Sequence, residues 1–423
     1  MFIEFSVKNF RSLKETQVLS MTKTKGDEHE DTNCFNLEGI NKLGLVKSLV
    51  IYGANASGKS NLIHALIEMK AIVNESASES QEGDSLPLTA FLFDKISPNE
   101  PTEFEIMFIA DNVRYQYGFS ATRSKIIEEW LIAYPKGRAQ RWFSRLFNEE
   151  KNLSEYKFSD HLQGQKSIWQ SSTRSNALFL STAVQLNSDQ LKPIFNWFKN
   201  QLRPAGLGGW KPSFSASLCD DESKKDEVLG FLKSADISIH DIQVKSEKFN
   251  LDNFPDDLSE SFREKLQKEL KDKEIYDIKT IHKTDDGELF YLEFDEESDG
   301  TKKLFSFAGP WLDSLKKGYI LVIDELNDNL HPKLVRYLIG LFHSTVTNPN
   351  NAQLIFTTHD TSILNQDVFR RDQIWFCEKN KQQATSVYPL SDFNPRKGRE
   401  NIELGYLTGR YGALPFINFN DLK

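Results

Sequence analysis

Residues 53–60 form the stretch that most constrains what this chain can fold into. They read GANASGKS and match the pattern G-x-x-x-x-G-K-[ST]. An apolar run at 49–52 precedes the motif. Apolar residues at helical spacing follow it: Leu62, Ile63, Leu66 and Ile67. The sequence therefore predicts a buried strand, a phosphate-binding loop and a helix, in that order.

The residue types of this loop suit a nucleoside triphosphate with Mg²⁺. Glycines at 53 and 58 let the backbone curl tightly, so that its N–H groups can surround phosphate oxygens. The positive end of the following helix points toward the same place. We expect Lys59 to reach the β- and γ-phosphates and Ser60 to bind Mg²⁺. The expected ATP-binding residues are Gly53, Ala54, Asn55, Ala56, Ser57, Gly58, Lys59, Ser60 and Asn61.

A second apolar strand, at 318–325, ends in two carboxylates, Asp324 and Glu325. In a chain with a phosphate loop, this pattern is typical of a Walker B strand. Asp324 is expected to hold Mg²⁺ through water, and Glu325 to act as the general base that polarises the attacking water. A third strand, 355–360, ends at His359 after an intervening helix, which predicts a neighbouring parallel strand with His359 beside the γ-phosphate.

The pentapeptide SDGTK at 298–302 precedes a helix expected at 304–315. Serine and glycine at a helix N-terminus can form a second anion site. Taken alone the pentapeptide is a weak signal, but it lies shortly before the Asp324 strand.

Composition narrows the classes of protein that remain. The chain has 423 residues, enough for two or three lobes, and a formal net charge of −9, which gives no global attraction to nucleic acid. The three cysteines show no metal-ligand spacing, and neither an 18-residue apolar run nor a signal pattern at the N-terminus occurs. We expect a cytoplasmic protein with no membrane segment.

The pattern along the chain predicts three parts. The range 1–120 carries the phosphate loop and an antiparallel β meander, 121–281 is an inserted α+β or helical lobe, and 282–423 carries the second half of the site. The inserted lobe contains no motif that can be converted into chemistry, and a charged helix is expected there at 257–273. Arg11 lies in a basic N-terminal turn, where ATP contact and simple solubility are equally good interpretations.

The ordered set of motifs resembles the ATPase head shared by ABC, SMC and RecF-like proteins. The resemblance implies an α/β fold: an ABC-type P-loop ATPase head with an antiparallel β subdomain and an inserted, largely helical lobe. It implies a head-to-head homodimer or higher homo-oligomer, in which the signature residues Ser298, Gly300 and Lys302 act in trans. It also implies that Arg11 touches ATP. The family's Q-loop glutamine has two candidate positions, Gln116 and Glu129.

A closer resemblance covers most of the chain. It is carried by VKNFRSLKE, GANASGKSNL, NALFLSTAVQLN, SDGTKKLFSFAG, VIDELNDNLHPKL, TTHDTSILN and the ending Y-L-x-G-R-Y-G-x-x-P. These are similar to the AAA-family ATP-binding proteins of bacterial phage defence and abortive infection, of the RloA and AbiL type. That resemblance implies a separately encoded effector, a nuclease or toxin, with DNA or a phage component as a further partner.

Four functions compete on this evidence. The first is an ATP-dependent switch of a defence system that holds or releases an effector. The second is a DNA repair or recombination ATPase of RecF or SMC-like kind, which lacks support from heptads or a basic balance. A transporter ATPase fits poorly with the long insertion between Lys59 and Ser298. A nuclease of the overcoming-lysogenization-defect type would need a further domain, yet only 64 residues without a D-x-D follow His359. We therefore expect ATP hydrolysis without intrinsic nuclease activity.

Overall fold

The computed structural model describes residues 1–37, 43–205, 209–248, 263, 274–396, 398 and 400–415. It divides into two compact units. Unit 1 comprises Met1–Leu207, Ser314–Asp328 and Val335–Lys423, and unit 2 comprises Gly208–Asp313 and Asn329–Leu334. The helix expected at 257–273 lies outside the described residues. Among the described helices, none combines the length and apolar character that a membrane crossing requires.

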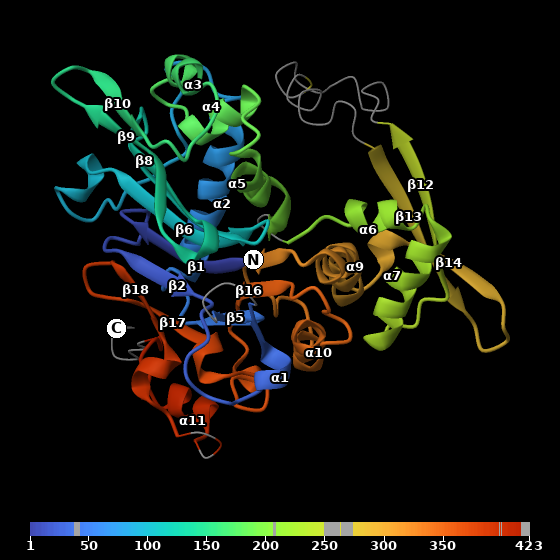
Figure 1. The fold of residues 1–423 in the computed structure, drawn as a ribbon. Helices are drawn as coiled ribbons and strands as arrows, with labels where there is room; N and C mark the ends of the chain where they lie inside the picture. Colours follow the sequence, from blue (N-terminus) through green and yellow to red (C-terminus); the bar gives the residue numbers. More distant parts are fainter. Residues whose placement is uncertain are drawn as a thin grey trace. The chain divides into compact units, whose positions relative to one another are not determined.

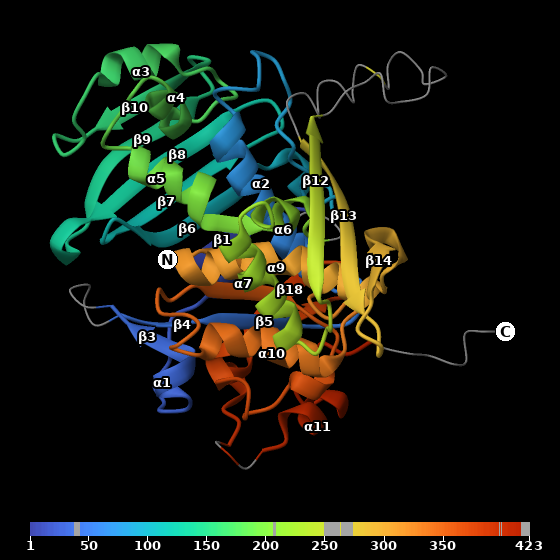
Figure 2. The same ribbon diagram turned by 90° about the vertical axis from the view of Figure 1, so that its right-hand side faces the viewer.

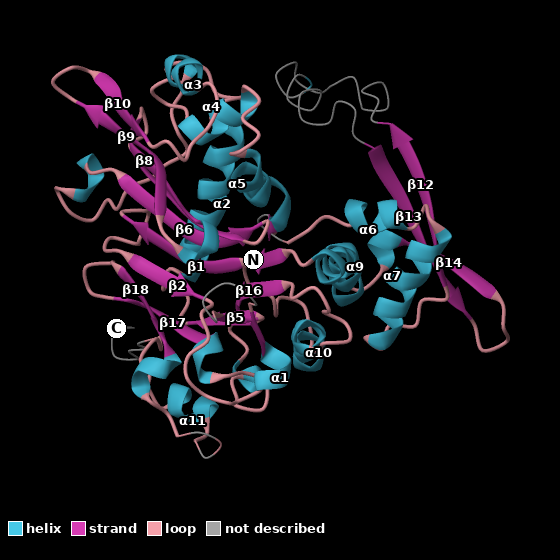
Figure 3. Cartoon of the chain, viewed as in Figure 1, coloured by secondary structure: helices cyan, strands magenta, loops and turns pink. Residues whose placement is uncertain are grey.

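Unit 1 contains a six-stranded sheet, mostly parallel, that carries the motifs (Figures 1 and 3). Its strand order is β11 (Leu202–Pro204), β15 (Ile320–Ile323), β16 (Gln353–Thr357), β5 (Ser48–Tyr52), β17 (Ile374–Lys379) and β18 (Thr385–Pro389). Neighbours from β11 to β17 pair in parallel, and β18 pairs antiparallel at the edge. Strands β15, β16 and β5 are buried throughout, which explains their continuous apolar runs.

A seven-stranded antiparallel sheet forms the second layer of unit 1. Its order is β10 (Leu153–Phe158), β9 (Gln140–Asn148), β8 (Ile126–Tyr134), β7 (Val113–Ala121), β6 (Thr102–Ala110), β1 (Phe2–Lys8) and β2 (Gln17–Ser20). The helix α2 (Lys59–Glu75) lies against this sheet (Figure 2), and one continuous apolar core joins α2 to both sheets. Burial of this core is the main source of stability that fixes α2, and with it the phosphate loop.

The remaining elements of unit 1 are short. A small antiparallel pair joins β3 (Cys34–Asn36) and β4 (Gly44–Val46). The helices are α1 (Glu30–Asn33), α3 (Lys166–Ser172), α4 (Phe179–Gln185), α5 (Lys192–Asn196), α11 (Ile402–Leu407) and the part of α10 (Pro332–His343) from Val335 onward. Helix α10 is amphipathic, and its buried face includes Val335, Leu338, Ile339 and Phe342.

Unit 2 is mixed in its described residues. A three-stranded antiparallel sheet joins β12 (Asp241–Lys248), β13 (Glu274–Lys283) and β14 (Leu289–Glu293). The helices α6 (Ser213–Leu218) and α7 (Glu222–Ser234) accompany it, and α9 (Asp299–Lys317) begins in this unit. Phe307 and Trp311 of α9 stack with ring centroids 5.0 Å apart, and Trp210 packs edge-on against both rings.

The expected boundary between residues 120 and 121 differs from the division in the structure. It falls inside the antiparallel sheet, because β7 pairs with β8 along its whole length and β9 and β10 extend the same sheet. The inserted unit begins near residue 208. The meander expected within 1–120 therefore continues past residue 120 through β8, β9 and β10.

A buried ion pair explains how the β8 strand holds a helix. Glu129 is fully buried, accepts hydrogen bonds from the N–H groups of Phe179 and Leu180, and lies 3.8 Å from Arg145. Burial raises the pKa of Glu129, and Arg145 opposes this shift. The carboxylate satisfies N–H groups at the start of α4 that would otherwise lack partners.

We expect Glu129→Ala to lower the free energy of unfolding by about 3–5 kcal/mol, because it leaves Arg145 buried without its counter-ion. Urea unfolding followed by fluorescence measures the change. The exposed neighbour Glu128 provides a matched control, and Glu128→Ala should change stability by less than about 0.5 kcal/mol. Equal effects of the two substitutions would contradict this structural role.

Candidate functional site

The phosphate loop is held in shape by contacts that tolerate no side chain at its glycines. A Cβ on Gly53 would lie 2.3 Å from the Cys377 carbonyl oxygen, and one on Gly58 would lie 2.2 Å from Thr385 Oγ1. Gly58 also has a φ of 110°, in the left-handed region. The loop therefore packs directly against β17 and β18, and glycine is required at both positions.

Hydrogen bonds from hydroxyl and amide groups also hold the loop in place. Thr385 Oγ1 lies 2.8 Å from both Ser12 Oγ and the Ser57 carbonyl oxygen. Asn61 donates its amide hydrogen to Ser12 Oγ at 2.7 Å. Ser12 belongs to the N-terminal turn that was expected to reach the nucleotide through Arg11. The structure thus brings the neighbouring serine, through its hydroxyl, to the loop.

The side chain of Lys59 folds back over the first residues of the phosphate loop. Its ammonium donates to the carbonyl oxygens of Gly53 at 2.9 Å and Ala54 at 3.1 Å. The residue is 5% exposed, and this burial lowers the pKa of Lys59, while Asp324 and Glu325 act in the opposite direction. The Lys59 ammonium therefore binds backbone carbonyl oxygens in this structure. A phosphate group can replace these carbonyls as its hydrogen-bond acceptor.

The carboxyl ends of β15 and β16 meet through one hydroxyl group. Thr357, the last residue of β16, donates to Asp324 Oδ1 at 2.6 Å and accepts from the Glu325 N–H at 2.8 Å. Glu325 has a φ of 56°, which is uncommon for a residue with a side chain and is often found at functional sites. The Thr357 hydroxyl therefore orients the Asp324 carboxylate and holds the backbone of Glu325 at the end of β15.

His359 lies beside Glu325, as the strand order predicts. Its ring Nε2 is 3.4 Å from Glu325 Oε1. Its backbone N–H donates to Asn327 Oδ1 at 3.3 Å. Burial is the main cause that lowers the pKa of His359, and Lys59 adds to it, while Glu325 acts in the opposite direction. A neutral imidazole can donate to a phosphate oxygen and still leave the Glu325 carboxylate charged.

These residues surround a cavity of about 380 Å³. It is lined by Asn55, Ala56, Ser57, Gly58, Lys59, Ser60, Asn61, Glu325, His359 and Lys379. Lys379 ends β17 and was not predicted; the charged end of the IWFCEK strand, parallel to β5, was the available signal. Thr357 and Asn327 also position the site without having been predicted.

The chemistry of these side chains fits Mg²⁺ together with a triphosphate. Ser60 offers a hydroxyl, and Asp324 offers a carboxylate already oriented by Thr357. Magnesium in such sites uses one or two protein oxygens, with phosphate oxygens and water completing the shell. The loop at 55–60 lines the cavity with backbone N–H groups that can surround phosphate oxygens.

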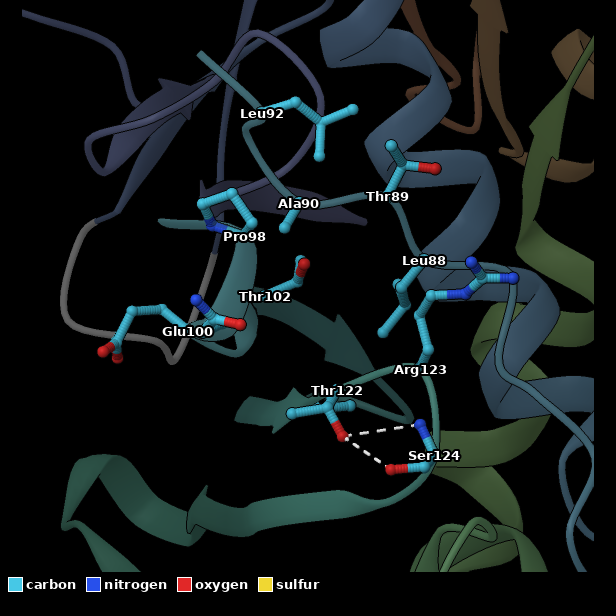
Figure 4. A pocket seen from close by; sticks show the side chains of 12 residues that line it. Leu88, Thr89, Ala90, Leu92, Pro98, Glu100, Thr102, Thr122, Arg123 and Ser124 are labelled. Atoms are coloured by element: carbon cyan, nitrogen blue, oxygen red, sulfur yellow. Dashed lines mark hydrogen bonds between the residues drawn. The ribbon is translucent and has the colours of Figure 1, made fainter. Parts of the chain in front are cut away.

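A larger cavity, of about 470 Å³, lies elsewhere in unit 1 (Figure 4). Its charged lining consists of Glu100 and Arg123, and the Thr122 hydroxyl bonds to Ser124 within it. One carboxylate balances one guanidinium, so the cavity offers no excess of positive charge for a polyphosphate. The smaller cavity has two lysines and the start of α2, and it is the better candidate in spite of its size.

Several predicted residues are not among those that line the smaller cavity, including Gly53, Ala54 and Asp324. The Arg11 guanidinium lies over the Phe10 ring, 5.3 Å from its centroid, and is not among the lining residues, so its contact with ATP stays a prediction. Gln116 accepts a hydrogen bond from Tyr134 at 2.8 Å in the antiparallel sheet. Glu129 is occupied by its helix and Arg145, as described above, which argues against a nucleotide-linked role.

The signature residues belong to unit 2. Ser298 is exposed, and its hydroxyl accepts from the Thr301 N–H at 3.1 Å, which makes it the N-terminal cap of α9. A Cβ on Gly300 would lie 3.2 Å from the Asn329 carbonyl oxygen. Lys302 Nζ lies 3.3 Å from Asp299 Oδ1. This 19-residue helix begins at Asp299, before the start expected at 304, so Ser298 caps it and Gly300 lies in its first turn.

Fold and site together define a P-loop ATPase head of the ABC type. The model of the family described as "AAA domain, putative AbiEii toxin, Type IV TA system" matches residues 48–365, and the chain belongs to this family. No curated protein matches the chain.

Solved structures add two similar folds. The SMC head domain from Thermotoga maritima is 12% identical over 92% of this chain and 98% of that chain, with a TM-score of 0.40. The recombination mediator protein RecF, in its ATPrS structure, is 14% identical over 92% of this chain and 98% of that chain, with a TM-score of 0.35.

We expect Lys59→Ala to weaken ATP binding by about 100-fold, because hydrogen bonds to charged groups contribute about 1.5–3 kcal/mol each. Titration with a fluorescent ATP analogue measures the dissociation constant. Arg123→Ala, in the larger cavity, is the matched control and should leave it unchanged. Loss of binding in the control but not in Lys59→Ala would move the nucleotide to the other cavity.

Proposed function

We propose that this chain is an ATP-binding and ATP-hydrolysing switch that dimerises head-to-head. The observation that carries the proposal is the meeting of three strand ends, from β5, β15 and β16, around one cavity. Each end supplies a different part of phosphoryl transfer: a phosphate cradle, a carboxylate pair and a histidine.

The residues divide the reaction among themselves. Lys59 and the loop N–H groups bind and orient the phosphates, and Ser60 with Asp324 would hold Mg²⁺, which neutralises charge that develops on phosphate oxygens. Glu325 accepts a proton from the attacking water. His359 donates to the γ-phosphate and, through its closeness to Glu325, ties the position of the base to the presence of that phosphate.

The dimer rests on unit 2. Ser298 caps α9 and is nevertheless exposed, so its hydroxyl and the N-terminus of a long helix are available to a second molecule. In the proposed dimer, Ser298 and Gly300 of one copy close on the ATP of the other, with Lys302 beside them. ATP then acts as the link between two heads, and its hydrolysis releases them.

The biological setting that we propose is bacterial phage defence. Membership of a family whose description names an abortive-infection toxin and a toxin–antitoxin system supports this setting. The switch would control a separately encoded effector, a nuclease or toxin, in the cytoplasm. A RecF- or SMC-like repair ATPase is the alternative, because the same head can serve either function.

We expect Glu325→Gln to retain ATP binding and to lower turnover by about 100-fold or more, since a general base contributes about 10²–10⁴-fold. Phosphate release under saturating ATP measures turnover. The control is Glu100→Gln in the larger cavity, which should hydrolyse ATP at the wild-type rate. Unchanged turnover in Glu325→Gln would exclude this residue as the base.

Ser298→Arg should lower ATP turnover of the full chain strongly while leaving ATP affinity at low protein concentration unchanged. The added bulk and charge oppose closure of a second copy but do not alter the phosphate loop. The rate is measured as a function of protein concentration, with Ser213→Arg, at the exposed first position of α6, as control. Normal turnover in Ser298→Arg would refute action in trans.

The nuclease alternatives are separated by incubation of the purified chain with DNA and RNA in the presence of Mg²⁺ and ATP. We expect no cleavage by this chain alone. Cleavage that disappears in the Lys59 and Glu325 variants would replace the separate effector with an intrinsic activity. Stimulation of the ATPase by DNA, without cleavage, would favour the repair alternative.

A further inference from the structure

The C-terminal segment touches the phosphate loop directly. The Ala54 N–H, at the second position of the loop, donates to the Ala413 carbonyl oxygen at 2.9 Å. Ala413 is 1% exposed and has a φ of 58°. One N–H of the loop is therefore bound by a backbone carbonyl 359 residues away in sequence. A change in the shape of the loop at Ala54 would move this contact.

Tyr406 of α11 supports both sides of this contact. Its hydroxyl donates to the Ala413 carbonyl oxygen at 3.2 Å. Its ring lies 5.9 Å, centroid to centroid, from the ring of Tyr52, and it stacks on Phe376 at 5.4 Å. Tyr52 immediately precedes Gly53, so Tyr406 packs against the residue that leads into the loop and orients the carbonyl that binds inside it.

Helix α11 also reaches the residues that follow His359. The Glu403 carboxylate accepts a hydrogen bond from the Thr361 hydroxyl at 2.8 Å. The Tyr52 hydroxyl donates to the Asp360 carbonyl oxygen at 3.0 Å. The same helix is thus linked to the phosphate loop by Tyr406, through Ala413, and contacts the histidine loop through Glu403, three positions earlier.

The segment is anchored firmly enough to act on both loops. The Tyr388 hydroxyl, on β18, donates to the Tyr411 carbonyl oxygen at 3.0 Å. Gly412 has a φ of 68°, and a Cβ there would lie 2.7 Å from Glu378 Oε2 and from the Tyr388 hydroxyl oxygen. The turn at 411–413 is therefore seated on β17 and β18, the strands against which the phosphate loop also packs.

We propose that residues 402–415, which we name the C-terminal clamp, position the catalytic loops through two separate contacts. Tyr406 is a positioning residue for the phosphate loop, acting through Ala413. Glu403 is a positioning residue for the His359 loop, acting through Thr361. The proposal rests on the proposed function, since it assigns these contacts to ATP binding and to ATP turnover respectively.

Two substitutions separate the contacts. Tyr406→Phe keeps the ring and removes the hydroxyl, so we expect the dissociation constant for ATP to rise about fivefold, the equivalent of one neutral hydrogen bond, with kcat nearly unchanged. Glu403→Leu should lower kcat severalfold and leave the dissociation constant unchanged. Glu403→Gln should restore kcat, because its amide oxygen can still accept from Thr361.

The exposed Leu407, on the same helix, provides the control, and Leu407→Ala should match the wild type in both parameters. Circular dichroism confirms that each variant is folded. The clamp is refuted if Tyr406→Phe binds ATP as the wild type does, or if Tyr406→Phe and Glu403→Leu alter the same parameter equally. Failure of the wild type to bind ATP at all would instead refute the proposed function.

Discussion

Parallel pairing of β15, β16 and β5 is the constraint on which the rest of this structure depends. Strands that run the same way end at the same edge of a sheet, so the residues that follow them must share one region of space. The register pairs Phe356 with both Ile323 and Val50, which brings the carboxylates, the histidine and the phosphate loop to the same level. The second sheet and α2 bury the apolar faces that keep this arrangement.

The site also stores local strain. Glu325 holds a left-handed backbone, which costs about 1–3 kcal/mol for a residue with a side chain. The Thr357 hydroxyl offsets part of that cost, since it accepts from the Glu325 N–H while it donates to Asp324. The backbone of the base is thereby fixed at the strand end, which places its carboxylate beside His359.

Much of the fold and site could be predicted because short patterns encode them. Composition alone identifies the phosphate loop, the strand before Asp324 and the strand before His359. Their order along the chain predicts that they meet at one edge of a sheet. Glu129 could not be placed in this way. Two adjacent glutamates are typical of an exposed position, yet Glu129 alternates with the buried Leu131 and Ala133 and faces the core, whereas Glu128 does not.

The remaining features lack a side-chain signature. The contact from Ala413 to the loop is made by a backbone carbonyl, which any residue possesses, and only the fold brings it to Ala54. Lys379 is one lysine among many until the pairing of β17 with β5 places it at the cavity. The order of the motifs predicts that their strand ends share an edge, whereas the contacts of Ala413 and Lys379 follow only from the fold.

Native mass spectrometry of Glu325→Gln with ATP and Mg²⁺ tests the central claim most directly. The account predicts a species with two copies of the chain and two ATP molecules, which is replaced by single copies when ADP is supplied in place of ATP. A single copy carrying one ATP under the same conditions, at protein concentrations well above the dissociation constant for ATP, would contradict the head-to-head switch.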